Sequence, residues 1–197
     1  RGDWEAVYDL YANAVEATWD PNERLEWTKL TAEIAEDRLE DRAKAIEAWE
    51  RLYDLGDFVE EASRELAYLY RAAGRWAEMA EFLEEQAKTL SGDARIVVLR
   101  EIAEVRLSGM EDLDGSSEVL GRILREKPND PIATAQLARI HARRQDWDAL
   151  QDLGDAGAEE LPEEERIERQ EMVADALWQA GRYERAANAY EKILKVD

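Results

Sequence analysis

The feature that most constrains this chain is a short turn followed by an aromatic residue, which recurs along its length. The aromatic residues of these turns are Trp4, Trp76, Trp147 and Tyr183, and they are separated by 72, 71 and 36 residues. The spacing indicates a period of about 36 residues and a doubled unit of about 71 residues, within the range of repeat proteins. A chain of this kind stacks one small unit on the next, because each unit has an apolar face that it cannot bury alone.

Between the turns, the pattern of apolar residues is that of amphipathic helices. In the last repeat, apolar residues recur every three or four positions and leave Glu, Arg and Lys for the opposite face, as in Tyr183, Ala186, Ala187, Tyr190, Ile193 and Leu194. The pairs Asp20-Pro21 and Asp130-Pro131 predict helix starts, because Asp caps a helix and Pro fits its first turn. We therefore predict eleven helices and no strands, at residues 3–18, 22–38, 41–54, 57–73, 75–89, 93–108, 113–127, 131–144, 146–160, 163–180 and 182–196.

The composition excludes several classes of partner. The 26 basic residues against 47 acidic ones give a net charge of −21, which repels nucleic-acid backbones and anionic lipid headgroups. No apolar run reaches the roughly 18 residues of a membrane span, so neither nucleic-acid binding nor membrane insertion is predicted. The absence of cysteine removes disulfides and thiolate sites but leaves the compartment open.

The turn and helix residues together resemble the tetratricopeptide repeat. The closest match is the last repeat, through Val173, Ala174, Leu177, Gly181, Tyr183, Ala186, Tyr190 and Ile193. The repeat at 57–90 matches through Leu66, Ala67, Tyr70, Gly74, Trp76 and Leu83, and the repeat at 93–128 through Ala103, Leu120, Ile123 and Pro128. The doubled unit is similar to long arrays in bacterial scaffold proteins.

This resemblance implies an all-α, right-handed α-solenoid of antiparallel helix pairs, with about five pairs and one extra N-terminal helix. Residues 1–197 would form a single array. Helix 3–18 would be the second helix of a preceding repeat, and the repeats would lie at about 22–56, 57–92, 93–129, 130–161 and 162–197.

Three departures from the family pattern are visible. Arg42 occupies a position where a turn aromatic is expected, and Gln145 replaces a turn Gly. Gly154 and Gly157 lie inside the helix predicted from 146. Each Gly costs a helix about 1 kcal/mol relative to Ala, which indicates close helix approach, local looseness or a site that a partner supports.

Catalytic and metal sites are not predicted, and no cofactor is expected. His141 is the single histidine and lacks a second His or Cys that could complete a metal shell, so we interpret it as a core or groove-edge residue. The segment 112–115 begins like a calcium loop, but Met110 and Gly121 occupy two of the positions that must supply ligands. No nucleophile elbow, phosphate-binding Gly loop or His-based triad is present, and the chain is predicted not to be an enzyme.

The aromatic residues divide into structural and exposed candidates. Trp4, Trp76 and Trp147 share one repeat position, at which the family packs an aromatic between helices, and Trp49 occupies a bulky position of a second helix. We therefore predict that these four pack in the core. Trp178 follows the core residue Leu177 on the side of a first helix that faces the groove in this family, and it is a candidate partner contact.

In the tetratricopeptide family the concave groove is lined by first-helix residues beside the core positions. The middle repeats offer a basic stripe there, while the flanking repeats offer Glu26, Glu33, Glu36, Glu171 and Asp175. The stripe could bind carboxylates of an acidic peptide, or its Arg residues could pair with neighbouring Glu residues as surface ion pairs. The candidate partner-binding residues are Arg64, Tyr68, Arg71, Arg100, Arg139 and Trp178.

The function that the sequence favours is a protein–protein interaction scaffold that binds a peptide or a partner segment, such as an acidic one, in the groove. The alternative is a structural spacer or a self-assembling arm of a larger protein, in which uncapped helix-pair ends of separate copies associate.

Overall fold

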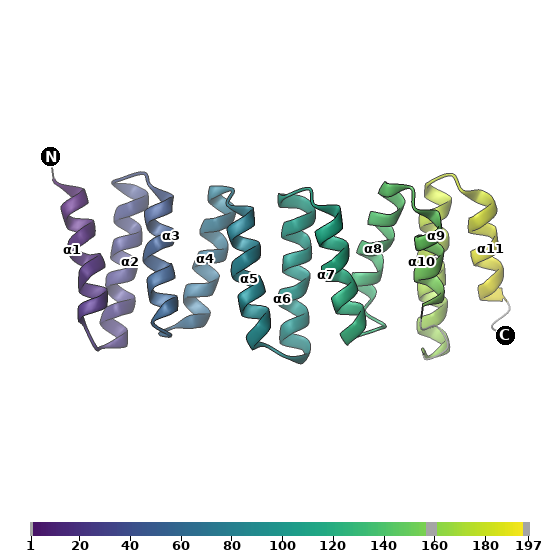
Figure 1. Ribbon diagram of the computed structural model, residues 1–197, viewed down its shortest axis with the longest axis horizontal. Helices are drawn as coiled ribbons and strands as arrows, with labels where there is room; N and C mark the ends of the chain where they lie inside the picture. The colour runs from purple at the N-terminus through teal and green to yellow at the C-terminus, as the bar shows by residue number, and fades with distance from the viewer. Residues whose placement is uncertain (1, 157–160, 195–197) are drawn as a thin grey trace. The chain divides into compact units, whose positions relative to one another are not determined.

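The computed structural model describes residues 2–156 and 161–194, and over these residues the chain is all-α, as the sequence predicts (Figure 1). The described residues form no strand. The helices are α1 (Trp4–Ala17), α2 (Pro21–Asp37), α3 (Arg42–Asp54), α4 (Val59–Ala73), α5 (Trp76–Thr89), α6 (Gly92–Glu104), the short π-helix η1 (Val105–Gly109), α7 (Leu113–Glu126), α8 (Pro131–Arg144), α9 (Trp147–Asp155), α10 (Glu163–Gln179) and α11 (Tyr183–Leu194).

The chain divides into two compact units, residues 1–81 and 82–197, and the boundary falls inside α5. In the N-terminal unit α1, α2, α3 and α4 pack as sequential antiparallel neighbours, and in the C-terminal unit α6, α7, α8, α9, α10 and α11 do so (Figure 1). Both units therefore consist of the helix pairs that the repeat pattern predicts.

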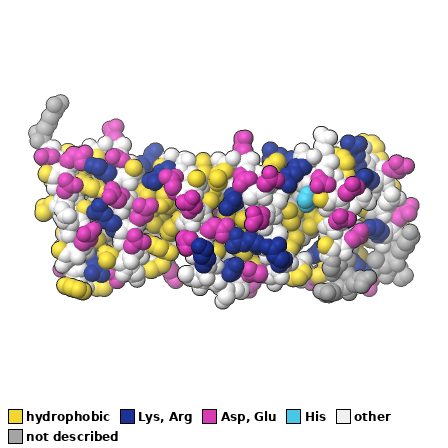
Figure 2. All heavy atoms as spheres, viewed as in Figure 1, with side chains coloured by type: hydrophobic (Ala, Val, Ile, Leu, Met, Phe, Trp, Pro, Cys, Tyr) yellow, Lys and Arg dark blue, Asp and Glu magenta, His cyan; other side chains and the backbone are white. Residues whose placement is uncertain are grey.

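The core of each unit is formed by the apolar stripes of its helices. In the N-terminal unit Ile46, Leu52 and Leu66 are completely buried, and Trp49 is buried as predicted. The fully buried large side chains of the C-terminal unit are Leu99, Ile102, Leu120, Ile123, Ile140, Leu150 and Leu177. Acidic and basic side chains are interspersed over the face seen in Figure 2.

Aspartates begin most of the helices. A side-chain oxygen of each accepts a hydrogen bond from a backbone N–H in the first turn, which satisfies a donor without a partner inside the helix. Pro follows the capping residue in α2 and α8, as the Asp-Pro pairs predict. The capping residues are Asp3, Asp20, Asp41, Asp112, Asp130 and Asp146.

The start of α7 is shaped by a π-helical turn that the sequence did not predict. The pattern predicts one helix over 93–108, but α6 ends at Glu104 and η1 follows, with Met110 N–H donating to Val105 O at 3.1 Å. The η1 turn carries Arg106, whose guanidinium lies 3.3 Å from the carboxylate of Asp112. Segment 112–115 is therefore a helix cap with an ion pair.

We expect Gly115→Ala and Gly121→Ala, both in α7, to have opposite effects. A Cβ at Gly115 would overlap the Asp112 carboxylate and the Arg106 guanidinium, whereas a Cβ at Gly121 would meet only Arg125 Nη1 at 3.8 Å. Gly115→Ala should lower the free energy of unfolding by about 1 kcal/mol because the cap is disturbed. Gly121→Ala should raise it by about 0.5–1 kcal/mol through helix propensity.

Urea unfolding followed by circular dichroism measures both changes. A stabilised Gly115→Ala variant would contradict the packing of Asp112 and Arg106 around this glycine.

The helix with two glycines is shorter than predicted. α9 ends at Asp155, where the sequence predicts a helix to 160, and Gly157 lies outside the described residues. Gly154 is buried, and a Cβ there would lie 3.1 Å from the amide nitrogen of Gln170 on α10. For Gly154, close helix approach is thus the explanation that the structure supports.

Candidate protein-binding surface

In the C-terminal unit the first helices α8 and α10 pack against each other and expose the faces that point away from the core. α8 exposes Ile132 and Arg139, and α10 exposes Glu168, Asp175 and Trp178. The exposed residues follow each other at intervals of three or seven, so each set lies along one side of its helix. This surface mixes apolar, basic and acidic groups.

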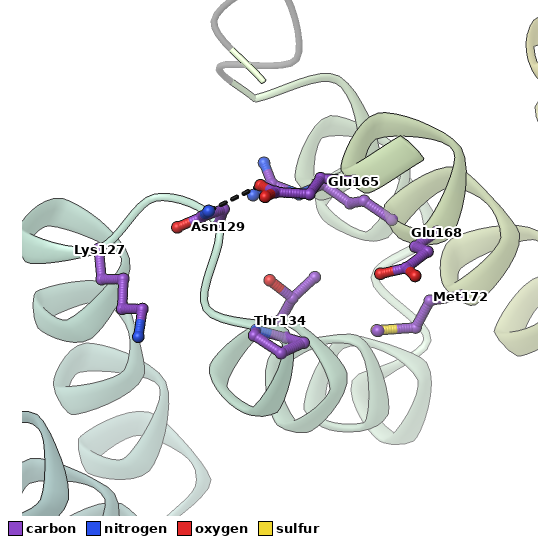
Figure 3. A pocket seen from close by; sticks show the side chains of 8 residues that line it. Lys127, Asn129, Thr134, Glu165, Glu168 and Met172 are labelled. Atoms are coloured by element: carbon purple, nitrogen blue, oxygen red, sulfur yellow. Dashed lines mark hydrogen bonds between the residues drawn. The ribbon is translucent and has the colours of Figure 1, made fainter. Parts of the chain in front are cut away.

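A cavity of about 300 Å³ opens between the α7–α8 loop, the start of α8 and the first half of α10 (Figure 3). Glu168 and Met172 project toward it from α10, Thr134 from α8, and Lys127 lies across from them. One side is closed by a hydrogen bond in which Asn129 Nδ2 donates to Glu165 Oε2 at 2.6 Å. The cavity therefore has an apolar and hydroxyl-bearing floor and a charged rim.

Arg169 fixes the wall of this cavity. Its side chain is only 6 % exposed, and its guanidinium donates to Ala156 O at 2.6 Å and to Pro128 O. Burial lowers the pKa of the Arg169 guanidinium, and the negative charge of Glu165 opposes that shift. These bonds tie the α7–α8 loop and the end of α9 to α10, which holds the cavity open between them.

Arg100 does not lie free on the surface. Its guanidinium pairs with the carboxylate of Asp130, which is completely buried and also caps α8. Of the two readings of the basic stripe, Arg100 therefore follows the one in which an arginine pairs with an acidic residue of the protein itself. Arg139, also exposed, forms no ion pair with any residue that the structure describes.

In the N-terminal unit, Arg64, Tyr68 and Arg71 are exposed on α4. Tyr68 borders a polar hollow of about 580 Å³ that is also lined by Glu36, Asp37, Glu40 and Arg42. The structure brings these three candidates onto one helix. Arg100, Arg139 and Trp178 belong to the other unit, so a groove that joins all six stays a prediction.

Trp178 is 57 % exposed and is therefore available to a partner. Its ring meets that of Tyr183 edge to face, with centroids 4.8 Å apart. Asp175, one turn earlier on α10, accepts a hydrogen bond from the Tyr190 hydroxyl of α11. A partner contact at Trp178 remains a prediction, because the structure contains a single chain.

The prediction that the turn aromatics are core residues is wrong for Trp4, which is 39 % exposed. The Arg38 guanidinium covers its ring at 5.0 Å, and Arg182 covers the half-buried Trp147 ring at 4.7 Å. Trp4 and Trp147 each begin a helix, and in both cases a cation from the following repeat covers the ring. Such contacts contribute about 0.5–1 kcal/mol at exposed sites. Trp76 is also only half-buried.

His141 is half-buried on α8, as the sequence indicates. Burial lowers the pKa of its imidazole, Asp146 opposes that shift, and Arg144 reinforces it. Across residues 2–156 and 161–194, no cluster of three acidic or histidine side chains has a geometry that could hold a metal ion.

Sequence reasoning missed two features of these surfaces. The cavity walls come from a loop and two helices, and no local pattern marks such a meeting point. Trp19, between α1 and α2, is 92 % exposed. The signal that could have identified it is its position outside both the helical periodicity and the repeated turn.

Comparison with known proteins bears on the C-terminal repeat. Residues 172–197 match the family model described as tetratricopeptide repeat. A search of curated proteins finds no match. In the part of the chain that the structure describes, no helix is both long enough and apolar enough to cross a membrane.

Tetratricopeptide repeats generally serve as protein–protein interaction scaffolds and are typically not catalytic. The match begins in the second half of α10 and includes α11, and the helix pairs of both units have the architecture expected of the family. The C-terminal repeat of this chain is thus similar to the tetratricopeptide repeat in sequence, and the all-α helix pairs of each unit agree with the fold of that family.

Proposed function

We propose that this chain is an interaction scaffold in which the exposed faces of α8 and α10 bind a segment of a partner protein. The observation that carries the proposal is the cavity between these first helices. Its volume of about 300 Å³ is at the small end of ligand pockets, which suits one bulky side chain of a bound segment. Pro131 and Met172 supply apolar contact for that side chain. Lys127 and Glu168 can orient the backbone or polar groups of the bound segment on either side of it.

Basic residues on the first helices suggest which segments bind. Arg139 lies on the same face of α8, and Arg64 lies on α4 of the other unit; neither forms an ion pair with a described residue. An acidic segment would match Arg139, and Trp178 is proposed as a further contact of the C-terminal unit. Arg64, Tyr68 and Arg71 are proposed as contacts that the N-terminal unit offers by itself. Arg100 is proposed to act through Asp130, by holding the start of α8 beside the cavity.

The test is a selection of 15-residue peptides from a random displayed library, followed by affinity measurement by fluorescence anisotropy. We expect selected peptides to pair an apolar side chain with acidic neighbours. Arg139→Glu should weaken their binding about tenfold, because it places like charges against the peptide. Met172→Glu should weaken it similarly, because a carboxylate would then occupy the apolar floor.

Arg125→Glu is the matched control, because Arg125 is exposed on the second helix α7 and the charge change is identical. Loss of binding that is equal in Arg139→Glu and Arg125→Glu would show a long-range charge effect and not a site. Arg100 is left intact, since reversing its charge would place two carboxylates beside the start of α8.

Self-assembly is the competing function, and sedimentation of the chain distinguishes it. A monomer at micromolar concentration would count against a self-assembling arm, whereas oligomers that grow with concentration would count for it.

A further inference from the structure

The most exposed tryptophan of the described chain lies in a loop at one edge of the N-terminal unit. Trp19 occupies the turn between α1 and α2, where neither helix covers its ring. A single exposed apolar side chain is ordinary on a protein surface, whereas a contiguous patch of them marks an interaction site.

The α3–α4 loop brings further apolar side chains to the same edge. Leu55, Phe58 and Val59 are all exposed in or beside this loop. Both loops lie at the lower edge of the unit in Figure 1, and Figure 2 shows hydrophobic side chains along that edge. We name Trp19, Leu55, Phe58 and Val59 the loop patch.

Arg24 joins the two loops. Its Nε donates to Thr18 O at 3.0 Å, next to Trp19, and its Nη1 donates to Asp57 Oδ2 at 2.6 Å, next to Phe58. The side chains of Arg24 and Asp57 are 13 % and 19 % exposed. A largely buried ion pair thus fixes the spacing of the two parts of the loop patch, so the patch is pre-organised.

The backbone at Phe58 is unusual in a way that favours a role in contact. Phe58 has φ 48° and ψ 41°, in the left-handed region that large side chains seldom adopt, and it begins α4 without a side-chain cap. At the starts of α2 and α8 an Asp occupies this position and caps the helix. In the α3–α4 loop the Asp is one residue earlier and pairs with Arg24, which leaves an aromatic ring at the exposed helix start. Strain without a local structural gain is typical of binding positions.

Charge around the loop patch is predominantly negative. The carboxylates of Asp20, Glu23, Asp54 and Glu60 form no ion pair with described residues. Arg24 is already matched by Asp57, and Arg64 is the other cation near Phe58 and Val59. This surface repels a second copy of itself and anionic lipid, and it attracts a cationic segment.

We propose that the loop patch is a docking site for a partner segment that presents apolar side chains flanked by Lys or Arg. Trp19 and Phe58 would be the apolar anchors, and the four carboxylates would match the flanking cations. This site uses none of the residues proposed on α8 and α10, and it would stand if the binding proposed there failed.

Three synthetic 16-residue helical peptides test the proposal by fluorescence anisotropy with the whole chain. One has a Leu/Phe face and Lys flanks, the second has the same apolar face with Glu flanks, and the third has the Lys content in a scrambled order without an apolar face. We expect the first peptide to bind, with the second and third at least about tenfold weaker. Raising the salt concentration should weaken the first peptide.

Trp19→Ser and Phe58→Ser should each weaken the first peptide at least about tenfold, as expected for anchor residues. Leu10→Ser is the matched control, because Leu10 is 66 % exposed on α1 outside the loop patch, and it should change binding less than about twofold. Trp19→Ser removes an exposed side chain, so the melting temperature of this variant should equal that of the parent chain. Equal melting temperatures exclude misfolding as the cause of lost binding.

Three results would overturn the proposal. The first is equal binding of the Lys-flanked and Glu-flanked peptides, and the second is unchanged binding by both Ser variants. The third is an interaction of another kind that requires Trp19, detected either as dimerisation in sedimentation or as pelleting with phosphatidylcholine vesicles.

Discussion

Asp130→Ala is expected to lower the free energy of unfolding of the C-terminal unit by about 3–4 kcal/mol. The Asp130 side chain is completely buried, accepts from Ala133 N–H at 3.0 Å and pairs with Arg100. Its removal deletes a helix cap, which costs about 1 kcal/mol, and leaves the Arg100 guanidinium without its carboxylate. Breaking a buried pair on one side costs about 3–5 kcal/mol, and the partial exposure of Arg100 places this case at the low end.

Asp20→Ala is the control, because Asp20 also precedes a Pro and caps a first helix but is exposed. We expect it to cost about 1 kcal/mol, the value of a cap alone. Asp130→Asn should fall between the two, since the amide oxygen can still cap α8 but carries no charge. Urea unfolding measures all three, and equal losses for Asp130→Ala and Asp20→Ala would show that the pair with Arg100 contributes nothing.

Leu177→Ala is expected to cost about 3 kcal/mol, whereas Trp178→Ala at the next position should cost less than about 1 kcal/mol. Leu177 is completely buried, so its truncation removes apolar contact and leaves a cavity. Trp178 is mostly in water and would lose mainly its edge-to-face contact with Tyr183, which is worth about 0.5–1 kcal/mol.

Chemical unfolding monitored by circular dichroism at 222 nm compares the two variants of α10. A larger loss for Trp178→Ala would mean that this indole is a structural residue, and it would remove Trp178 from the candidate partner contacts.

The helices could be predicted from the sequence because their signals are local. Spacing of three and four residues, an Asp before the first turn and Gly or Gln after the last turn all act within one helix, so nine of the eleven predicted ranges agree with the described helices to within two residues. Helix α9 and the end of α6 differ, because Gly154 packs against Gln170 and η1 turns the chain before α7. Those causes involve residues from neighbouring helices.

The candidate site was less predictable, since its residues depend on what surrounds them. The repeat position identified Arg100 and Arg139 equally, but the Asp130 carboxylate, 30 residues from Arg100 in sequence, reaches Arg100. The cavity beside Met172 requires Arg169 to hold two distant carbonyl groups, and no sequence pattern contains that information.

The sequence by itself determined that this protein is built of amphipathic helix pairs with a repeated turn, because helix periodicity and capping are properties of neighbouring residues. The tertiary structure alone decided which charges are paired, where a cavity opens and that Trp19 is left in water beside Phe58. Those outcomes depend on side chains that meet only after the helices have packed, and residues with the same spacing can meet different neighbours.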